Sequence, residues 1–494
     1  MLNFLSLTRK EFKLLSLIFL LALIPRLWRI HTDLQIHFDQ GLHSFAIWDI
    51  WHERKLSLLG HQTDTDGIFH GPIYYWFMIP AYAIGGGDPG AAAIFQILLH
   101  SLAIFFLFSL AKQLFNSQVA LLSSFLYAVS YGYISYSRWL SNVTPVLPFS
   151  IVFFWFLYYL YQGKINLLPA VTFLASLLTQ FHAASGVFLS LVVFFILISK
   201  RLYRQVSFRI ALLSLITFII PHLPLLAFEL RHNFVVSQSV LKLSRDQSSG
   251  LGFSIPVFQH NFQTFLTELV HLTSFPFAWM TIIPFVISVF LLLRNRFFTL
   301  IILPFFFFLS LYRRGTFGFF FMPLFPLFTI LFSNSILLLP KILKYILLVT
   351  LVAINLSLWK NFLYPTHALT PIGAFNLITS QDRKNVVDWV YQDASGQPFA
   401  LWIYTIPYFL DQPWSYYFVW YGQDKYGYQP EKIGSFSPGD LKSAQIFYNI
   451  YEPDDDRPTR LESWLDEVNK NFGPVVGIFS SNDARVERRT WPNK

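Results

Sequence analysis

A short polar segment near the start of the chain holds the residue best suited to chemistry. Asp39 lies in the run His37-Phe38-Asp39-Gln40-Gly41. A carboxylate held just above a membrane surface can take the proton from a hydroxyl group, or it can bind a metal ion. The residue types and spacing leave both roles open, together with that of a solvated aspartate in a loop.

Further histidine and acidic residues follow in the same segment. His61, Asp64, Asp66 and His70 are the types that ligate a divalent metal, but their spacing matches no specific ligand motif, so a metal is left open. An aromatic run then begins at Tyr74. Such a run suits an amphipathic helix at the membrane interface, which favours a substrate with an apolar tail.

Two polar residues stand at the ends of apolar runs later in the chain. Arg138 is a lone cation at the end of one such run, where it either reaches lipid headgroups or binds a phosphate. His182 falls between two half-length apolar runs. There a histidine either packs in the protein or lines a cavity.

Charged residues also open two later polar segments. Glu229 and Arg231 open one segment, and Arg313 with Arg314 stands in the other. All four are candidate substrate-binding residues. The topology derived below places both segments outside the cell, where paired arginines depart from the usual distribution of positive charge. We therefore expect an anionic partner at these arginines.

Composition identifies the environment in which these residues work. Of the 494 residues 54% are hydrophobic and only 13% are charged, with a mean hydropathy of +0.48. Soluble domains carry about 25% charged residues. Apolar runs about 17 to 22 residues long match helices that cross a hydrocarbon core about 30 Å thick. The sequence predicts a polytopic α-helical membrane protein, without a disulfide framework because it has no cysteine.

Eleven transmembrane helices are expected. The segment from 73 to 85 is too short to span and suits an interfacial or re-entrant helix. With that segment not crossing, the short basic loops all fall on the cytoplasmic side with the N-terminus. The net charge of +9 is then explained by basic residues that anchor cytoplasmic loops at the membrane, and it does not indicate a nucleic-acid-binding protein. The predicted spans are 12 to 30, 91 to 111, 119 to 137, 143 to 161, 166 to 181, 184 to 199, 209 to 228, 272 to 293, 297 to 311, 319 to 339 and 343 to 359.

The same topology divides the chain into two domains. Residues 1–359 form the transmembrane domain, with a large outer loop at 31–90. Residues 360–494 carry more charge and alternate between helix-like and strand-like patterns. We expect this tail to be a small extracytoplasmic α/β domain, attached to a multi-pass protein of the plasma (inner) membrane.

These residues in this order resemble the C-type (GT-C) membrane glycosyltransferases, the broad group that includes protein O-mannosyltransferases and lipid A aminoarabinose transferases. The resemblance covers about residues 10 to 340 and rests on the motifs below. It implies a multi-span bundle whose active site faces away from the cytoplasm. It also implies a polyprenyl-phosphate sugar donor and a glycan, lipid or protein acceptor. The motifs are Asp39-Gln40, His70-Gly71-Pro72-Ile73-Tyr74-Tyr75, Ser137-Arg138 and the Pro-rich run Phe321 to Pro326.

The resemblance assigns a role to several of these residues. Asp39 matches the first acid of the family's Asp-Glu pair and is implied to be the general base, but Gln40 replaces the second acid. His70-Gly71-Pro72 resembles the family's His-Pro-Pro run, and aromatic residues from Tyr74 would seat the lipid or sugar ring. Arg138 matches the arginine of the Ser-Arg element. It would hold the departing phosphate together with Arg231, Arg313 or Arg314.

Two other function classes remain as alternatives. A polytopic transporter or lipid flippase would also need many spans, but it predicts internal repeats and charges near the middle of the membrane. No repeat is visible, and the charges cluster at the outer surface. An inactive relative that binds glycan is the second alternative, and Gln40 keeps it open.

Overall fold

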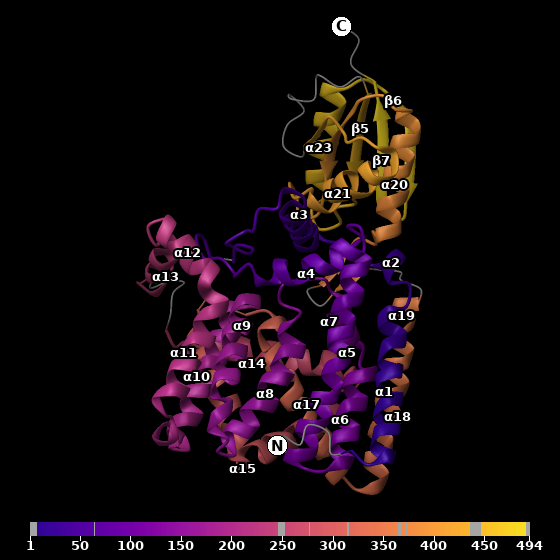
Figure 1. The fold of residues 1–494 in the computed structure, drawn as a ribbon. Coiled ribbons are helices and arrows are strands. Elements are labelled where there is room, and N and C mark those ends of the chain that lie inside the picture. Colours follow the sequence, from indigo (N-terminus) through magenta and orange to yellow (C-terminus); the bar gives the residue numbers. More distant parts are fainter. Residues whose placement is uncertain are drawn as a thin grey trace. The chain divides into compact units, whose positions relative to one another are not determined.

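The computed structural model describes residues 7–63, 65–245, 252–275, 277–313, 316–363, 368–370, 373–434 and 446–490. Helices fill the described chain as far as Leu363, and strands follow (Figure 1). The N-terminal helices are α1 (Arg9–Leu27), α2 (Ile30–Asp33), α3 (Phe38–Glu53), α4 (Ile73–Ile84), α5 (Pro89–Leu114), α6 (Ser117–Val129), α7 (Tyr131–Arg138), α8 (Val146–Tyr161), η1 (Ile165–Leu167), α9 (Leu168–Phe181), α10 (Ala183–Ser199), η2 (Leu202–Gln205), α11 (Phe208–Ile219), η3 (Ile220–His222), α12 (Leu223–Arg231), α13 (Val235–Arg245), α14 (Ile255–Thr273), α15 (Ala278–Arg294), α16 (Arg296–Leu309), η4 (Gly318–Leu324), α17 (Phe325–Leu338), α18 (Lys341–Leu358) and α19 (Lys360–Leu363).

Strands and shorter helices make up the rest. They are β1 (Ala368–Thr370), β2 (Gly373–Phe375), α20 (Ser380–Ala394), β3 (Phe399–Tyr404), α21 (Gln412–Tyr417), the π-helical turn η5 (Phe418–Gly422), α22 (Gln423–Tyr426), β4 (Lys432–Gly434), β5 (Ile446–Tyr451), α23 (Pro458–Asn471), β6 (Val475–Ser481) and β7 (Ala484–Arg489). The chain separates into two compact units. Unit 1 is Met1–Trp28, Leu56–Phe77 and Phe95–Lys360, and unit 2 is Arg29–Lys55, Met78–Ile94 and Asn361–Lys494.

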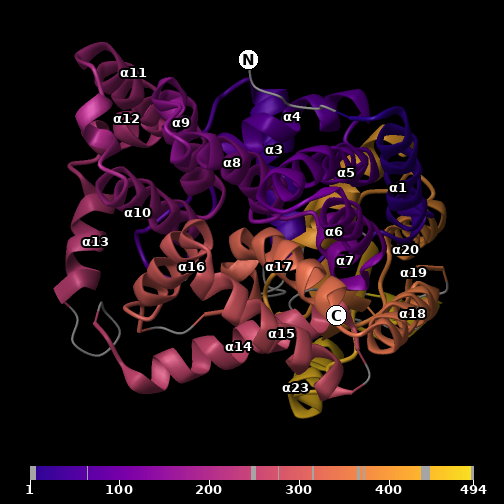
Figure 2. The same ribbon diagram turned by 90° about the horizontal axis from the view of Figure 1, so that it is seen from below.

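Unit 1 is a bundle of apolar helices. Helix α9 packs against α8, α10 and α11, α1 packs against α6, and α15 packs against α17. Seen along the bundle, α14 lies across the direction of its neighbours (Figure 2). Helices at the rim, such as α18, keep most of their apolar residues exposed, since only 17% of the span Lys341–Phe362 is buried. Exposed apolar faces of this kind fit the predicted position of these helices in a lipid bilayer.

In the part of the chain that the structure describes, four helices are long and apolar enough to cross a membrane, and up to six if each of two bent pairs is one span. The four are Pro89–Leu114, Phe208–Arg231, Gly318–Leu338 and Lys341–Phe362. Helical segments occupy each of the eleven predicted ranges, but several are shorter than a span. The predicted span 119 to 137 is a pair of helices, α6 and α7, bent by 58°, and the spans 272 to 293 and 297 to 311 form the second pair, bent by 108°.

At the bend between α6 and α7, backbone carbonyls that lose their helical hydrogen bonds are bonded by a side chain from another helix. Arg26, which is fully buried, donates to the carbonyl oxygens of Tyr127 at 2.9 Å and Ala128 at 2.8 Å. A break in an apolar helix is tolerated when other groups satisfy its carbonyls. Ser130 then starts α7, where its side chain accepts from the backbone N–H of Tyr133.

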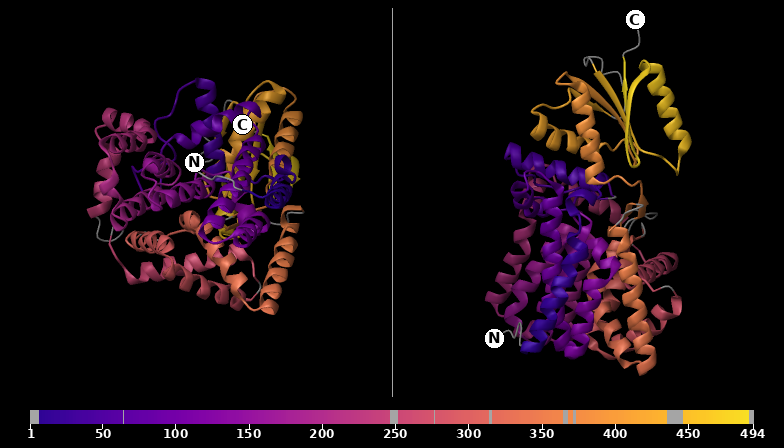
Figure 3. Two further views of the ribbon diagram at one scale, coloured as in Figure 1. Left: turned by 60° about the horizontal axis from the view of Figure 1, so that its bottom comes forward. Right: turned by 90° about the vertical axis from the view of Figure 1, so that its right-hand side faces the viewer.

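The tail in unit 2 contains the predicted α/β fold. Its five-stranded sheet has the order β4-β3-β5-β7-β6, with β4, β3 and β5 parallel and with β7 antiparallel to both of its neighbours. Helix α23 covers one face of the sheet and α20 covers the other (Figure 3). This two-sided cover fits the uninterrupted burial of the parallel strands β3 and β5 along most of their length.

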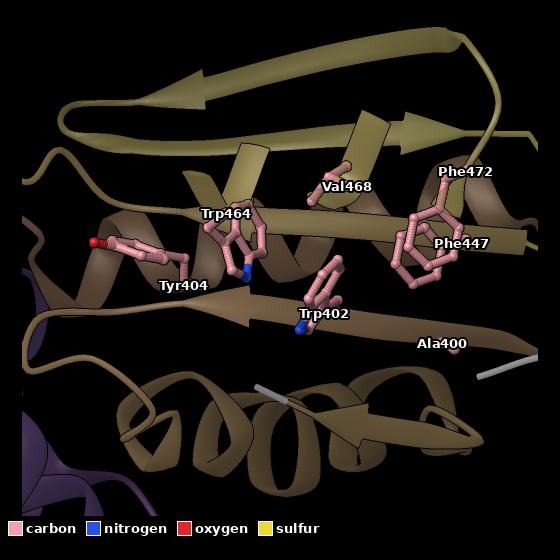
Figure 4. Packing of buried hydrophobic residues seen from close by; sticks show 7 residues of the cluster. All are labelled: Ala400, Trp402, Tyr404, Phe447, Trp464, Val468 and Phe472. Atoms are coloured by element: carbon pink, nitrogen blue, oxygen red, sulfur yellow. The ribbon is translucent and has the colours of Figure 1, made fainter. Parts of the chain in front are cut away.

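Large aromatic side chains fill the core between the sheet and α23 (Figure 4). Trp402 of β3 packs 4.9 Å from Trp464 of α23, and Phe447 of β5 stacks 3.8 Å from Phe472. On the opposite face, Phe399 meets Tyr391 of α20 edge-on at 5.1 Å. The period-two alternation along β3 thus assigns one set of side chains to each helix layer.

Candidate active site

Asp39 is the second residue of helix α3, and its side chain is partly exposed. The residue before the helix is His37, whose backbone N–H donates to Gln40 Oε1 at 2.9 Å. A carboxylate in the first turn is favoured by the partial positive charge of the helix N-terminus. The local fold therefore presents a carboxylate at a helix start, which suits an ionised group that must accept a proton.

Gln40, the residue after Asp39, has a structural role at the start of α3. Its side chain is fully buried and completes the capping box at the start of α3. Glutamine and glutamate serve equally at this position of a capping box. The glutamine therefore helps to fix the helix start and places no second negative charge beside Asp39.

His70 lies in unit 1, in the loop that leads into α4. Its backbone pairs with the chain nine and ten residues earlier: the N–H of His70 donates to the carbonyl of His61 and the N–H of Gly60 donates to the carbonyl of His70, both at 2.9 Å. Burial and the nearby charge of His61 lower the pKa of His70 to about 4. The ring is therefore neutral near pH 7 and can exchange hydrogen bonds with a ligand, but it does not supply positive charge to a phosphate.

The structure brings His70 close to one other predicted site residue. Its ring centroid lies 6.0 Å from that of His182, whose side chain is buried and packs edge-on against Phe320 at 4.5 Å. The Nδ1 atom of His182 is hydrogen-bonded to the hydroxyl of Ser185 at 2.6 Å, at the start of α10. Tyr74, also predicted, is buried in the first turn of α4.

Two predicted ligand residues make structural contacts at helix ends. Arg138 Nη1 donates to the carbonyls of Pro25, Arg26 and Trp28, at 3.1, 3.0 and 2.9 Å, and so satisfies the end of α1. The carboxylate of Glu229 accepts from the backbone N–H groups of Val236 at 2.8 Å and Ser237 at 2.9 Å. These bonds cap the start of α13.

The remaining predicted residues are dispersed. Arg231 is exposed at the end of α12, and Arg313 Nε donates to the carbonyl of Gly252 at 3.2 Å. Arg314 lies outside the described residues, as does Asp64. Within the residues that the structure describes, no three His, Asp or Glu side chains lie close enough to hold a metal ion.

Glu268 is a polar residue that the sequence interpretation passed over. It lies on α14 and accepts a hydrogen bond of 2.8 Å from the hydroxyl of Tyr136. Burial raises the pKa of Glu268 to about 7. A Cβ at Gly318 would come within 1.9 Å of Glu268 Oε1, so a larger residue there would displace the carboxyl from its present position. The signal in the sequence was a single acid within the apolar pattern of residues 255 to 273.

Comparison with a family model gives one match. Residues 69–227 match the model described as dolichyl-phosphate-mannose-protein mannosyltransferase. The matched region begins just before His70 and includes Tyr74, Arg138 and His182. No curated protein sequence matches the chain.

Solved structures are similar over nearly the whole chain. ArnT from Cupriavidus metallidurans in the apo state has a TM-score of 0.61 at 12% identity, covering 96% of this chain and 97% of that one. The same protein bound to undecaprenyl phosphate has a TM-score of 0.60, with the same identity and coverage. The archaeal oligosaccharyltransferase AglB from Archaeoglobus fulgidus, in complex with an inhibitory peptide and a dolichol-phosphate, has a TM-score of 0.51 at 12% identity, covering 97% and 74%.

The predicted resemblance is confirmed at the level of the fold. ArnT and AglB are GT-C glycosyltransferases, and the chain shares their fold, with its helical bundle and its C-terminal sheet domain. A multi-pass membrane protein is thereby confirmed. Identities of 12% carry no residue-by-residue assignment.

Proposed function

We propose that the chain is a membrane glycosyltransferase that moves a sugar from a polyprenyl-phosphate carrier to an acceptor hydroxyl outside the cytoplasm. The observation that carries the proposal is the fold shared with ArnT over nearly the whole of both chains. The family-model match over residues 69–227 and the undecaprenyl phosphate in one ArnT structure support the donor class. The acceptor is a glycan, a lipid or a protein.

In the proposed reaction Asp39 is the general base. Its carboxylate takes the proton of the acceptor hydroxyl while the acceptor oxygen bonds to the anomeric carbon of the sugar. The bond from that carbon to the phosphate oxygen breaks, its electron pair leaves with the polyprenyl phosphate, and the configuration inverts. Ionised Asp39 is favoured by its place in the first turn of α3.

Arginine side chains are proposed to stabilise the negative charge that grows on the departing phosphate. The candidates are Arg138, Arg231, Arg313 and Arg314. His70 and Tyr74 are proposed to bind the donor through hydrogen bonding and ring packing. Since the pKa of His70 is lowered to about 4, its part is that of a neutral group.

The proposed topology places the N-terminus in the cytoplasm and Asp39 with the tail domain outside the plasma (inner) membrane. The basic loops between spans support this orientation. The chain has no cysteine, so single cysteines can report it cleanly. A cysteine at exposed Glu462 should react with a membrane-impermeant thiol reagent in intact cells, and one at exposed Lys10 should react only after lysis.

The function is tested by transfer of radiolabelled sugar from a panel of polyprenyl-phosphate monosaccharides to acceptors, with the purified chain in lipid. Asp39→Asn should abolish turnover. The matched control is Asp49→Asn, which removes an exposed carboxylate from the same helix. Full turnover in Asp39→Asn would refute the role of Asp39. Glycan binding without turnover by the native chain would favour the inactive binding relative.

A further inference from the structure

The chain immediately before α3 is bonded to the C-terminal domain within unit 2. The backbone N–H of Ser380 donates to the carbonyl of Leu34 at 2.7 Å. Next to it, Gln35 and Thr379 form an antiparallel bridge. The segment that ends four residues before Asp39 is therefore held at the start of α20.

The chain immediately after Asp39 meets the same domain through its backbone. A Cβ on Gly41 would lie 2.5 Å from Pro413 N and 2.7 Å from the carbonyl carbon of Gln412. Both atoms belong to main chain at the start of α21, which cannot rotate away as the end of a side chain can. The approach of α3 to α21 is therefore close enough to require glycine at position 41.

Aromatic contacts continue this junction along α3. Phe45 meets the ring of Tyr416 edge-on at 5.4 Å, and Trp48 meets it at 6.2 Å. The hydroxyl of Tyr416 donates to the carbonyl of Gly87 at 2.7 Å. The junction thus extends from the helix start through at least two further turns.

The two anchoring elements are joined to each other by a buried polar network. The guanidinium of Arg383 in α20 lies 3.9 Å from Glu452 and donates to the carbonyl of Ile378 at 2.9 Å. Glu452 in turn accepts from Trp414 Nε1 of α21 at 2.8 Å. Because all three side chains are buried, their contacts fix the separation between α20 and α21.

We propose that the C-terminal domain is the positioning device for Asp39, with Gly41 as the positioning residue that sets α3 against α21. This rests on the proposed function, in which Asp39 is the base. The domain holds the chain on both sides of Asp39, at Leu34 and at Gly41, and so fixes the direction in which the first turn of α3 presents the carboxylate. A displacement of about 1 Å in a reacting group costs about 100-fold in rate.

The test compares Gly41→Ala with Gly434→Ala. The control adds the same methyl group in unit 2, where no atom of the described residues beyond its chain neighbours lies within 4 Å of it. Sugar transfer and amide hydrogen exchange of α3 are measured for the full chain in lipid. For Gly41→Ala we expect kcat to fall about 10- to 100-fold with little change in the donor KM. Exchange across residues 37–44 should be at least 10-fold faster, while the control matches the native chain in both.

Two outcomes overturn the proposal. One is a native kcat and native exchange in Gly41→Ala, and the other is a lower kcat with unchanged exchange at α3. If Gly41→Ala fails to fold, Glu452→Gln replaces it, since glutamine still accepts from Trp414 but no longer attracts Arg383. That variant should show faster exchange at α3 and a lower kcat, and a drop in thermal stability alone would refute the proposal.

The exchange measurement separates this proposal from the proposed function. If the native chain transfers no sugar from any donor, the proposed reaction fails. In that case faster amide exchange of α3 in Gly41→Ala would still support the anchoring of α3 by the C-terminal domain. Native exchange in this variant would refute it.

Discussion

The hydroxyl of Tyr136 donates a hydrogen bond of 2.8 Å to the carboxylate of Glu268. The two residues belong to different helices of unit 1, α7 and the transverse α14. Burial raises the pKa of Glu268 to about 7, although the bond from Tyr136 acts in the opposite direction. The carboxyl therefore changes its charge close to neutral pH.

Glu268→Gln should remove a decline in stability between about pH 4.5 and 7. The pKa of Glu268 is higher in the folded chain than in the unfolded one, so the folded chain holds more protons in this range, and native stability falls as pH rises. The rise from 4.5 to about 7 corresponds to about 3 kcal/mol once the group is ionised. The measurement is the thermal unfolding midpoint in lipid nanodiscs from pH 4.5 to 8.

The control for this prediction is Glu462→Gln, which makes the same change at an exposed position of α23. It should leave the native pH profile as it is. A pH profile of Glu268→Gln parallel to the native one would contradict the raised pKa.

Gly71→Ala should destabilise unit 1 through a collision with Gln180. The added Cβ would lie 1.5 Å from Gln180 Oε1, and this glutamine side chain is buried. We expect a loss of about 1 to 3 kcal/mol, typical of overpacking. Combining Gly71→Ala with Gln180→Ala removes the side chain that the new methyl group would meet. The double variant should therefore lose about 1 kcal/mol less unfolding free energy than the sum of the two single losses. Strict additivity of the three unfolding free energies would contradict the contact.

Hydrophobic patterning predicted the positions of most elements. The apolar runs predicted the helical ranges of unit 1, and the patterns after Lys360 predicted a mixture of helices and strands without assigning a type to each segment. Such predictions succeed because the spacing of buried apolar residues along the sequence follows the repeat of the helix or strand that they form. The break between α6 and α7 was missed because its stabilising partner, Arg26, lies about a hundred residues away in sequence.

The candidate site was less predictable than the fold. Asp39 could be singled out by residue type, but nothing local to it indicates that Gly41 contacts Pro413, some 370 residues later. The grouping of residues 29–55 with the tail in one unit depends on such long-range contacts. Arg138 and Glu229 were predicted as ligand residues, and their helix-end contacts were not foreseen because capping by a distant side chain leaves no mark in the spacing.

Arg138→Lys should lower stability more than the same change at Arg231. All three bonds to the carbonyls at the end of α1 come from the single Nη1 atom of Arg138, and the shorter side chain of lysine does not bring its ammonium to the same point. We expect a loss of about 1 to 3 kcal/mol, the cost of leaving buried acceptors without a partner. Arg231 is exposed, so Arg231→Lys should leave the unfolding midpoint within error. Equal midpoints for both variants would refute the structural part played by Arg138.

Glu229 should act as the cap of α13, with graded effects on its loss. The two carboxylate oxygens accept from the N–H groups of Val236 and Ser237, and one also accepts from the Ser237 hydroxyl. Glu229→Gln keeps one accepting oxygen and Glu229→Ala keeps none, so stability should fall in that order, by about 2 kcal/mol at most for a lost cap. Amide exchange of residues 235–240 should quicken in the same order. If both variants keep native exchange there but raise the donor KM, Glu229 is a ligand residue and the capping assignment is wrong.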